Sequence, residues 1–260
     1  AHNGREKVKI GIVGKYVDTG DFVLSDAYLS VIEAIKFSAF ELGVKPEIHW
    51  LNAKDYEKDP AKVKELAQYQ GILVPGGFGE SGIEGKIAAI KFAREEKIPY
   101  FGLCYGMQLL TVEYARNVAG LAGAHTTEIN PKTAHPVIMI LPEQAEKMAK
   151  KQYGGSMRLG AYPCNLAEGT VAQKAYKKDE ISERHRHRFE VNPAYVPQLK
   201  EAGLVFSGTS PDGTLMEIAE LPKGKHPFFL GTQFHPELKA RPLEPHPLFN
   251  AFVKAAMART

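Results

Sequence analysis

The first half of the chain alternates short, wholly apolar runs with longer segments in which apolar residues recur about every 3.6 positions. The short runs, rich in Val, Ile and Leu, predict strands at residues 7–13, 48–51, 71–75 and 100–103. The periodic segments between them predict helices at residues 26–42, 85–95 and 107–117. Strands that alternate with helices through short connections are typical of a doubly wound α/β sheet.

The second half of the chain is richer in predicted strands. Apolar runs predict them at residues 137–140, 204–206, 215–218 and 228–232, and a last helix is predicted at residues 248–257. The polar segment 142–155 is expected to be a loop or an insertion rather than a boundary between domains. We therefore predict a single α/β domain with a mostly parallel sheet and flanking helices.

Composition agrees with a globular protein and narrows its class. The chain has 260 residues, of which 44% are hydrophobic and 24% charged, and its formal net charge is only +3. This balance argues against a disordered chain, and a surface that binds nucleic acid needs a concentrated basic face. No apolar run reaches the length of about 18 residues that a membrane helix requires. We expect neither a nucleic-acid partner nor a membrane partner.

The N-terminus carries neither an initiator Met nor an apolar secretory signal. We interpret residues 1–6 as a cut end or a tag remnant and place the domain at residues 7–258, in the cytoplasm. The two cysteines, Cys104 and Cys164, are then expected to be free thiols, because disulfides are rare in that compartment. Each thiol is judged by its own surroundings, and Cys164 is expected to be structural.

Cys104 stands between a predicted strand and a predicted helix, in the sequence Gly102-Leu103-Cys104-Tyr105-Gly106. A nucleophile in such a tight turn is exposed above the edge of the sheet, and the helix N-terminus favours its thiolate form. The backbone N–H of the next residue, Tyr105, is the usual first donor to an oxyanion. The alternative is a buried structural cysteine whose neighbouring glycines serve packing.

A glycine-rich turn, Gly76-Gly77-Phe78-Gly79, follows the strand predicted at residues 71–75. Adjacent strands of an α/β sheet end at one crevice, so the backbone N–H groups of this turn could complete an oxyanion hole near Cys104. A phosphate-binding loop and a plain turn are the alternatives. The turn matches neither of the common phosphate-binding glycine patterns.

A base and a group to orient it follow the last predicted strand, in the sequence Gln233-Phe234-His235-Pro236-Glu237. Residues two apart in an extended segment point to one side, so Glu237 can hold the His235 ring, and Pro236 favours extended backbone before it. The alternative is an ordinary surface or core histidine, since the chain has 9 histidines. A cysteine, a histidine and a carboxylate together predict nucleophilic catalysis.

Together these pieces resemble the class I glutamine amidotransferases. The resemblance rests on Pro75–Gly79, Gly102–Gln108 and His235–Glu237. A narrower resemblance, to the glutaminase domain of the CTP synthase family, rests on residues 26–34, Gly154–Gly160 and Arg184–Asn192. Without that resemblance, the alternating Arg and His residues of the last stretch are typical of a solvated basic strand.

The resemblance implies a catalytic mechanism and its residues. It implies that Cys104 attacks the carboxamide of L-glutamine, that His235 is the general base and acid, and that Glu237 orients the histidine. Gly76 and Tyr105 are implied to be the backbone donors of the oxyanion hole. The implied reaction passes through a glutamyl thioester to glutamate and ammonia and needs no metal or organic cofactor.

The same resemblance implies the residues that bind the substrate. They are Gly77, Phe78, Tyr105, Gly106, Met107, Gln108, Glu128 and Arg188. Glu128 is expected to face the α-ammonium group of glutamine. Arg188 is expected to pair with the α-carboxylate, because a guanidinium group matches the geometry of a carboxylate.

The CTP synthase family also has an amidoligase part, which uses ATP and the released ammonia to convert UTP to CTP. This chain contains no ATP site, so the resemblance implies that it is the glutaminase domain and that the synthetase domain is its partner. ATP and Mg²⁺ are expected only in that other domain, and the full-length enzyme is expected to form homo-oligomers. Ser81 stands where the family usually carries a lid arginine, which argues against a family-like response to GTP.

Three other functions stay open on the sequence alone. The chain could be the amidotransferase subunit of another biosynthetic ligase, although the stretch Arg184–Asn192 argues against it. It could be another hydrolase on the same catalytic turn, such as a γ-glutamyl peptidase. It could also be a catalytically silent assembly module, although the cysteine, histidine and glutamate are all present.

Overall fold

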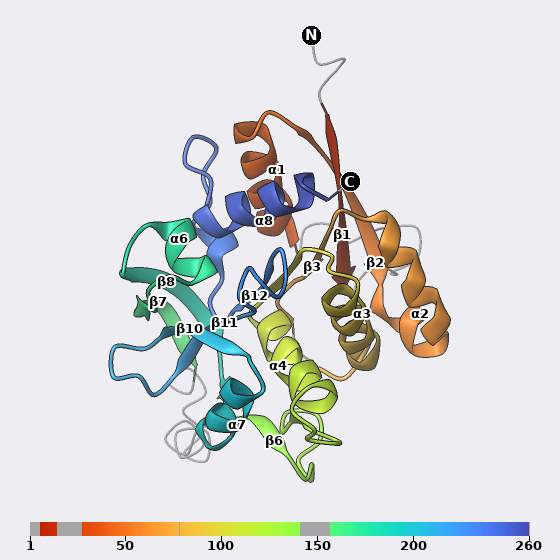
Figure 1. Ribbon diagram of the computed structural model, residues 1–260, viewed down its shortest axis with the longest axis vertical. Helices are drawn as coiled ribbons and strands as arrows, with labels where there is room; N and C mark the ends of the chain where they lie inside the picture. Colours follow the sequence, from red (N-terminus) through yellow and green to blue (C-terminus); the bar gives the residue numbers. More distant parts are fainter. Residues whose placement is uncertain (1–5, 15–27, 78, 141–156, 260) are drawn as a thin grey trace.

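The computed structural model describes residues 6–14, 28–77, 79–140 and 157–259. Over these residues the chain forms a nine-stranded sheet with helices on both faces and a separate three-stranded sheet (Figure 1). The strand order is β2-β1-β3-β4-β12-β11-β10-β7-β8 in the large sheet and β5-β6-β9 in the small sheet. The predicted α/β fold class is therefore confirmed.

The strands have the following bounds: β1 Lys7–Gly14, β2 Lys45–Asn52, β3 Gly71–Val74, β4 Tyr100–Leu103, β5 His125–Thr126, β6 Pro136–Ile140, β7 Arg158–Leu166, β8 Glu180–His187, β9 Phe189–Val191, β10 Val205–Thr209, β11 Met216–Glu220 and β12 Phe229–Thr232. The α-helices have the following bounds: α1 Leu29–Glu41, α2 Ala53–Lys58, α3 Ile83–Glu95, α4 Tyr105–Asn117, α6 Val171–Tyr176, α7 Val196–Glu201 and α8 Pro247–Met257. Short 3₁₀ helices lie at Pro60–Gln68, Pro193–Tyr195 and Pro236–Leu238.

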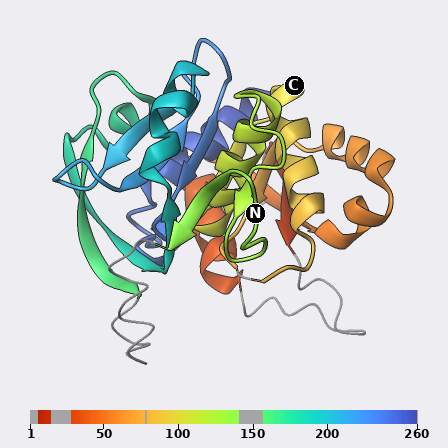
Figure 2. The ribbon, with the colours of Figure 1, turned by 90° about the horizontal axis from the view of Figure 1, so that it is seen from below.

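The large sheet has a parallel part and an antiparallel part. Strands β2, β1, β3, β4 and β12 are parallel to one another. β11 is antiparallel to β12, and β10, β7 and β8 continue the sheet in antiparallel pairs. The parallel part is the doubly wound unit that the first half of the sequence predicts. β7 and β8, which the apolar pattern does not predict, form a long antiparallel pair at the opposite end of the molecule from α2 (Figure 2).

Buried side chains alternate between the two faces of the central strands. Leu73 and Phe101 belong to the cluster under α1 and α8, whereas Ile72 and Tyr100 belong to the cluster under α3 and α4. All four side chains are wholly buried. Burying one such side chain contributes about 1.5–3 kcal/mol, so both helix layers are firmly attached to the strands that lead into the site.

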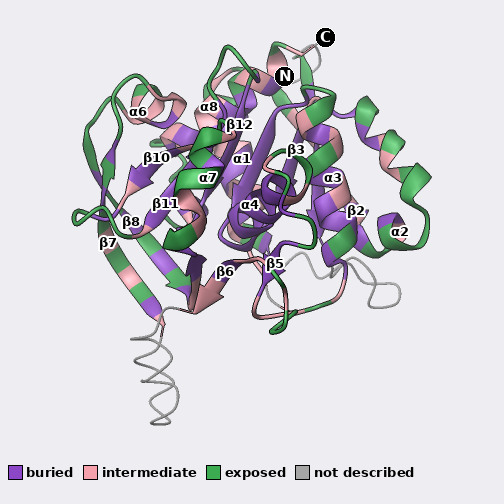
Figure 3. Ribbon diagram, turned by 60° about the horizontal axis from the view of Figure 1, so that its bottom comes forward, coloured by how far each residue is buried: buried purple, intermediate pink, exposed green. Residues whose placement is uncertain are grey.

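Helix α4 is the most enclosed helix of the described chain. Every residue from Tyr105 to Ala115 is buried, because the helix packs between the large sheet and the small one (Figure 3). A helix held on all sides is a rigid support for the residue at its N-terminus. That residue is Cys104.

Most predicted elements are present with small shifts at their ends. The start of the helix predicted at residues 26–42 and the whole loop predicted at residues 142–155 lie outside the described residues. The short helices α2, α6 and α7 were not predicted, since each spans 6 residues and gives too few turns for a periodic pattern. Within the described ranges, every helix is too short or too polar to span a bilayer.

Candidate active site

Three neighbouring parallel strands end at the same edge of the sheet. β3 pairs with β4, with Val74 opposite Gly102, and β4 pairs with β12, with Leu103 opposite Thr232. From these strand ends the chain continues into the glycine turn, into Cys104 and into the segment that contains His235. The three predicted chemical segments therefore meet at one crevice.

Cys104 is the single residue between β4 and α4. Its backbone has φ +50° and ψ −98°, a conformation that costs a residue with a side chain ~1–3 kcal/mol. Two contacts hold the turn: the Cys104 N–H donates to the Thr232 carbonyl at 2.6 Å, and Gly106 packs on β3 so closely that a Cβ there would lie 2.3 Å from the Val74 carbonyl oxygen. The thiol of Cys104 is therefore carried by a strained backbone at a helix N-terminus, where a helix dipole favours negative charge.

Gly76 lies between the cysteine and the histidine. A Cβ built on Gly76 would come within 2.9 Å of His235 Cε1 and 3.6 Å of the Cys104 Cβ. Any other residue would therefore push the imidazole ring away from the sulfur. The backbone of Gly76 borders the space in which a group attacked by Cys104 would lie.

His235 is held by Glu237 through a short hydrogen bond. The Nδ1 atom of His235 lies 2.7 Å from a carboxylate oxygen of Glu237, and both side chains are largely buried. The prediction that the two residues share one side of an extended segment is wrong, because Pro236–Leu238 forms a 3₁₀ turn that brings the carboxylate back to the ring. The predicted pairing of the two side chains is nevertheless present.

Charge at this edge keeps the histidine protonated. Burial alone lowers the pKa of His235, but the neighbouring Cys104 sulfur and the Glu237 carboxylate outweigh burial and raise that pKa. A charged imidazolium beside the Cys104 sulfur is the state that these surroundings favour. Such a pair is a ready nucleophile with a proton donor beside it.

Gln233 is a residue at this edge that the sequence analysis did not assign. Its side chain is wholly buried, and its amide Nε2 donates to the Cys104 Sγ at 3.7 Å. Its amide oxygen accepts a hydrogen bond from Gln108 Nε2 at 3.2 Å, which fixes the NH₂ end toward the sulfur. The signal was available, since Gln233 lies two residues before His235 and so points to the same side of an extended segment.

A cavity of about 530 Å³ opens above these groups. Its volume lies in the range of ~300–1,000 Å³ that is typical of small-molecule sites. Among the described residues, it is lined by Tyr28, Ser30, Val31, Gly76, Gly77, Cys104, Tyr105, Gln108, Glu128, Met157, Arg186, His187, Arg188, Phe189, His235, Glu237 and Leu238. The cavity thus joins the reactive cluster to one carboxylate and two guanidinium groups.

The predicted binding residues occupy different places around this cavity. Glu128 and Arg188 line it, and Glu128 accepts a hydrogen bond from the Gly79 N–H at 3.3 Å. Gln108 donates from Nε2 to the carbonyl of Phe189 at 3.0 Å as well as to Gln233, so both amide hydrogens point inward. Its remaining oxygen is an acceptor, which suits an ammonium group.

Of three further predicted binding residues, one cannot be placed and two do not line the cavity among the described residues. Phe78 lies outside the described residues. Gly106 packs on β3, and Met107 is wholly buried beneath the turn, where its Cα would lie 2.8 Å from a Cβ placed on Gly231. Any contact of Gly106 or Met107 with a substrate therefore stays a prediction.

A buried group of charges lies next to the cavity, in the antiparallel part of the sheet. Along β8 the arginines are exposed and the histidines are buried, so the predicted solvated strand is solvated on one face only. Arg158 on β7 pairs with Glu217 at 2.7 Å and with Glu190 at 3.4 Å. The rings of His185 and His187 meet at 3.0 Å between ring nitrogens.

Lys86 is a second residue near the site that the sequence analysis missed. This lysine on α3 is almost fully buried, and its Nζ lies 5.4 Å from the centre of the Tyr105 ring. It lies on the far side of the glycine turn, close to Gly77. Within the described ranges, no group of three or more His, Cys, Asp or Glu side chains is arranged to hold a metal ion.

Comparisons with known proteins agree with this geometry. The family model for glutamine amidotransferase class-I matches residues 23–255. The glutaminase domain of the Trypanosoma brucei CTP synthase, solved with bound acivicin, superposes with a TM-score of 0.88 at 36% identity, and the match covers 97% of this chain and 95% of that domain.

Relatives known by sequence extend the same comparison. A CTP synthase of Pelotomaculum thermopropionicum is 56% identical over 255 residues, which are 98% of this chain and 45% of that protein. A CTP synthase of Methanothrix thermoacetophila is 54% identical over 258 residues, again 98% of this chain and 45% of the relative. The chain thus spans about half the length of the curated relatives that it matches.

Proposed function

Because the chain belongs to the class I glutamine amidotransferase family and, within it, to the glutaminase domains of CTP synthases, we propose that it hydrolyses L-glutamine to glutamate and ammonia. The observation that carries the proposal is the arrangement at the sheet edge. There the strained Cys104 turn faces a histidine held at 2.7 Å by Glu237. A nucleophile, a proton donor and a group that orients the donor are the parts that this hydrolysis needs.

The first step is attack of the Cys104 sulfur on the carboxamide carbon of glutamine. A carbon–sulfur bond forms, and the carbonyl oxygen takes up negative charge. The backbone N–H groups of Gly76 and Tyr105 are proposed to receive that charge, and the closeness of Gly76 to both Cys104 and His235 supports this role. Losing one such donor typically lowers the rate by ~10²–10³-fold.

His235 is proposed to move the proton in both halves of the reaction. The imidazolium gives its proton to the departing nitrogen, so ammonia leaves and a glutamyl thioester stays on Cys104. The neutral ring then takes a proton from water, and the resulting hydroxide attacks the thioester carbon. Glutamate leaves, and the thiolate and imidazolium are restored. The steps as written use only these side chains and the backbone, without a metal or an organic cofactor.

The remaining cavity walls support glutamine as the substrate. Arg188 would pair with the α-carboxylate, while Glu128 and the amide oxygen of Gln108 would accept hydrogen bonds from the α-ammonium group. Both charged ends of a free amino acid thus find a partner of opposite charge. A γ-glutamyl peptide carries the same two α-charges and differs from glutamine only in the group on its γ-amide nitrogen, so these contacts support a γ-glutamyl amide with free α-groups.

We further propose that the ammonia is used to convert UTP to CTP. The support is the set of CTP synthase relatives, of which this chain matches one part. The ATP- and Mg²⁺-dependent amidation would then take place in a synthetase domain that corresponds to the rest of those relatives. That domain is the proposed partner of this chain.

The hydrolysis is tested by glutamate release from L-glutamine with two matched cysteine variants. Cys104→Ala should lower the rate by at least about 10³-fold, because it removes the nucleophile. Cys164→Ala, which also removes one buried thiol, should retain the parental rate. Loss of activity in both variants, or in neither, would contradict the proposed role of Cys104. Formation of CTP when the synthetase part of a relative is added, with ATP and UTP, tests the ammonia transfer.

A further inference from the structure

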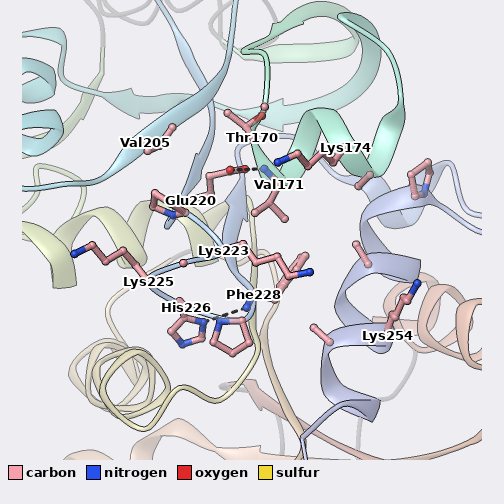
Figure 4. Close-up of a pocket in the computed structure, with 18 of the residues that line it drawn as sticks. Thr170, Val171, Lys174, Val205, Glu220, Lys223, Lys225, His226, Phe228 and Lys254 are labelled. Carbon is pink, nitrogen blue, oxygen red and sulfur yellow. Dashed lines mark hydrogen bonds between the residues drawn. The ribbon is translucent and has the colours of Figure 1, made fainter.

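A second and larger cavity lies away from the candidate active site. Its volume is about 1340 Å³, and it lies between α6, α8 and the loop that joins β11 to β12 (Figure 4). Phe228, at its floor, directly precedes β12, whereas His235 follows the other end of that strand. The cavity is therefore at the amino edge of the central strands, opposite the edge that carries Cys104.

Lysines surround this cavity. Lys174 on α6 extends over it toward Glu220, and Lys223 extends from the β11–β12 loop toward α8 (Figure 4). Lys254 stands at the rim on α8, whereas Lys225 points away to the other side of the loop (Figure 4). These lysines are exposed at the protein surface and come from three separate elements. Because Lys174 and Lys223 extend over the same cavity, they give it a positive field that attracts anions.

Six lysines and two glutamates line the described cavity wall, so positive side chains outnumber negative ones. Glu168 is exposed at the rim. Glu220 is buried, and its carboxylate already accepts hydrogen bonds from the Val171 N–H at 2.6 Å, from the Ala172 N–H at 3.0 Å and from Ser207 at 2.8 Å. Burial raises the pKa of Glu220, whereas these hydrogen bonds and the neighbouring Lys174 oppose the rise.

The inside of the cavity differs from its rim. The floor is apolar and includes Val171, Val205, Ala251 and the ring of Phe228. Asn250 also lines it, and its side-chain oxygen Oδ1 is buried without a hydrogen-bond partner in the described structure. A buried acceptor normally has a donor, so this oxygen is suited to a group that enters from the cavity.

We propose that this cavity, the amino-edge cleft, binds a phosphorylated small molecule that has an apolar ring or chain. The phosphate would lie between Lys174 and Lys223, the apolar body would rest on Phe228, and an N–H or O–H of the ligand would donate to Asn250. Lysine ammonium groups act as point charges that suit phosphate, and no arginine lines the described wall for two-pronged binding of a carboxylate. A small molecule is favoured over a protein segment because the acceptor oxygen of Asn250 is buried in the cavity wall rather than exposed at the surface.

The probe for this cleft is 8-anilinonaphthalene-1-sulfonate, which combines an anionic group, an aromatic body and an N–H donor. We expect its fluorescence to rise on binding and 4-nitrophenyl phosphate to displace it at lower concentration than inorganic phosphate does. Displacement by a synthetic acidic peptide of Glu and Leu, with no displacement by 4-nitrophenyl phosphate, would overturn the proposal in favour of a protein partner. Absence of probe binding would overturn it altogether.

Single variants locate the bound probe. Lys174→Gln and Lys223→Gln should each weaken probe binding about three- to tenfold, because each removes one charge contact. Lys225→Gln is the matched control from the same loop and should bind like the parent. All three variants should hydrolyse glutamine and melt like the parent, since these side chains are exposed and far from Cys104. Equal binding by Lys223→Gln and Lys225→Gln would refute the assignment.

Discussion

Two regions of this molecule bury histidines but favour different protonation states, a charged ring in one and neutral rings in the other. His235, at the end of β12, has its pKa raised, whereas His185 and His187, on β8, have theirs lowered, that of His185 to about 3. All three rings are largely removed from water. Burial lowers the pKa in every case, so burial alone does not decide the outcome.

The combined influence of the neighbouring charged groups decides it, because carboxylates also lie near the β8 rings: Glu217 is 3.7 Å from His185 Nδ1, and Glu190 is 3.4 Å from His187 Nδ1. His235 lies between the Cys104 sulfur and the Glu237 carboxylate, and two neighbouring anions stabilise its proton. After burial, the Arg158 guanidinium is the main lowering influence on the pKa of His185. The region at the end of β12 thus keeps a proton on His235 beside the Cys104 sulfur. The region on β8 keeps its imidazoles neutral beside the Arg158 guanidinium.

Hydrogen bonds in the β8 pair support the neutral state. His187 Nδ1 lies 3.2 Å from the Phe189 carbonyl, an acceptor, so Nδ1 carries the hydrogen. The other nitrogen, Nε2, is then free of hydrogen and accepts from His185 Nδ1 at 3.0 Å. Two charged rings could not meet in this way, because each would present only N–H groups.

Among the variants that test this comparison, Glu237→Gln is expected to have the largest effect on glutamine hydrolysis. Without the carboxylate, the pKa of His235 should fall, and the ring should lose its orientation as well as its proton. We expect glutamine hydrolysis to slow by about 10²-fold or more. The alkaline limb of the pH profile of kcat/KM should move to lower pH, because the imidazolium is lost earlier as the pH rises.

The same variant separates an orienting role from a structural one. Glu237→Asp keeps the charge and should recover part of the rate, with an alkaline limb close to that of the parent. An alkaline limb that stays in place in Glu237→Gln would contradict the claim that this carboxylate stabilises the charged histidine.

A smaller effect should follow from Gln233→Leu, which removes the amide that faces the sulfur at nearly constant volume. We expect the rate to fall about tenfold, the loss of one hydrogen bond to a charged group. Alkylation of Cys104 by iodoacetamide, measured as a rate against pH, should differ from that of the parent because the sulfur loses the amide that holds it in place. A parental alkylation profile would show that Gln233 only fills space.

The smallest effect is a change in stability, and it concerns the buried charges around Arg158 beside β8. Burial raises the pKa of Glu190 to about 8 from 4.5, although Arg158 opposes this rise. A raised pKa stabilises the fold at low pH, and this stability is lost as pH rises through the folded value. The parent should therefore lose stability from pH 5 to pH 8 while Glu190→Gln does not. The difference in free energy of unfolding between the variant and the parent should shift by at least about 1 kcal/mol in favour of the variant over this range.

Chemical denaturation at those two pH values measures the gain, and Glu180→Gln on the same strand is the matched control. Glu180 is exposed, so its variant should follow the pH dependence of the parent. If the free energy of unfolding of Glu180→Gln increased relative to the parent as much as that of Glu190→Gln, the effect would not depend on the burial of Glu190.

The region around Cys104 could be predicted from the sequence better than the buried face of β8. Cys104, Gly76 and His235 each follow a short apolar strand, and parallel strands place their ends at one edge, so local patterns were enough. The buried face of β8 could not be predicted in the same way. Its histidines are covered by pairing with β7, and that strand carries too little apolar pattern to be recognised.

Long-range packing also explains the other omissions. The contact of Gln233 with Cys104 joins residues far apart in the chain, and the amino-edge cleft likewise brings Lys174 and Lys223 to one cavity. The 3₁₀ turn at Pro236–Leu238 was missed because a proline restricts the residue before it more clearly than the residues after it.

The central claim is that Cys104 forms a covalent bond to the glutamyl group while His235 supplies the proton. The most direct test mixes the protein with L-glutamine, quenches with acid within the first turnovers and maps peptides by mass spectrometry. We predict one glutamyl group in thioester linkage on the peptide that contains Cys104, and none on the peptide that contains Cys164. Glutamate release without any adduct on Cys104, or with the adduct on Cys164, would contradict the account.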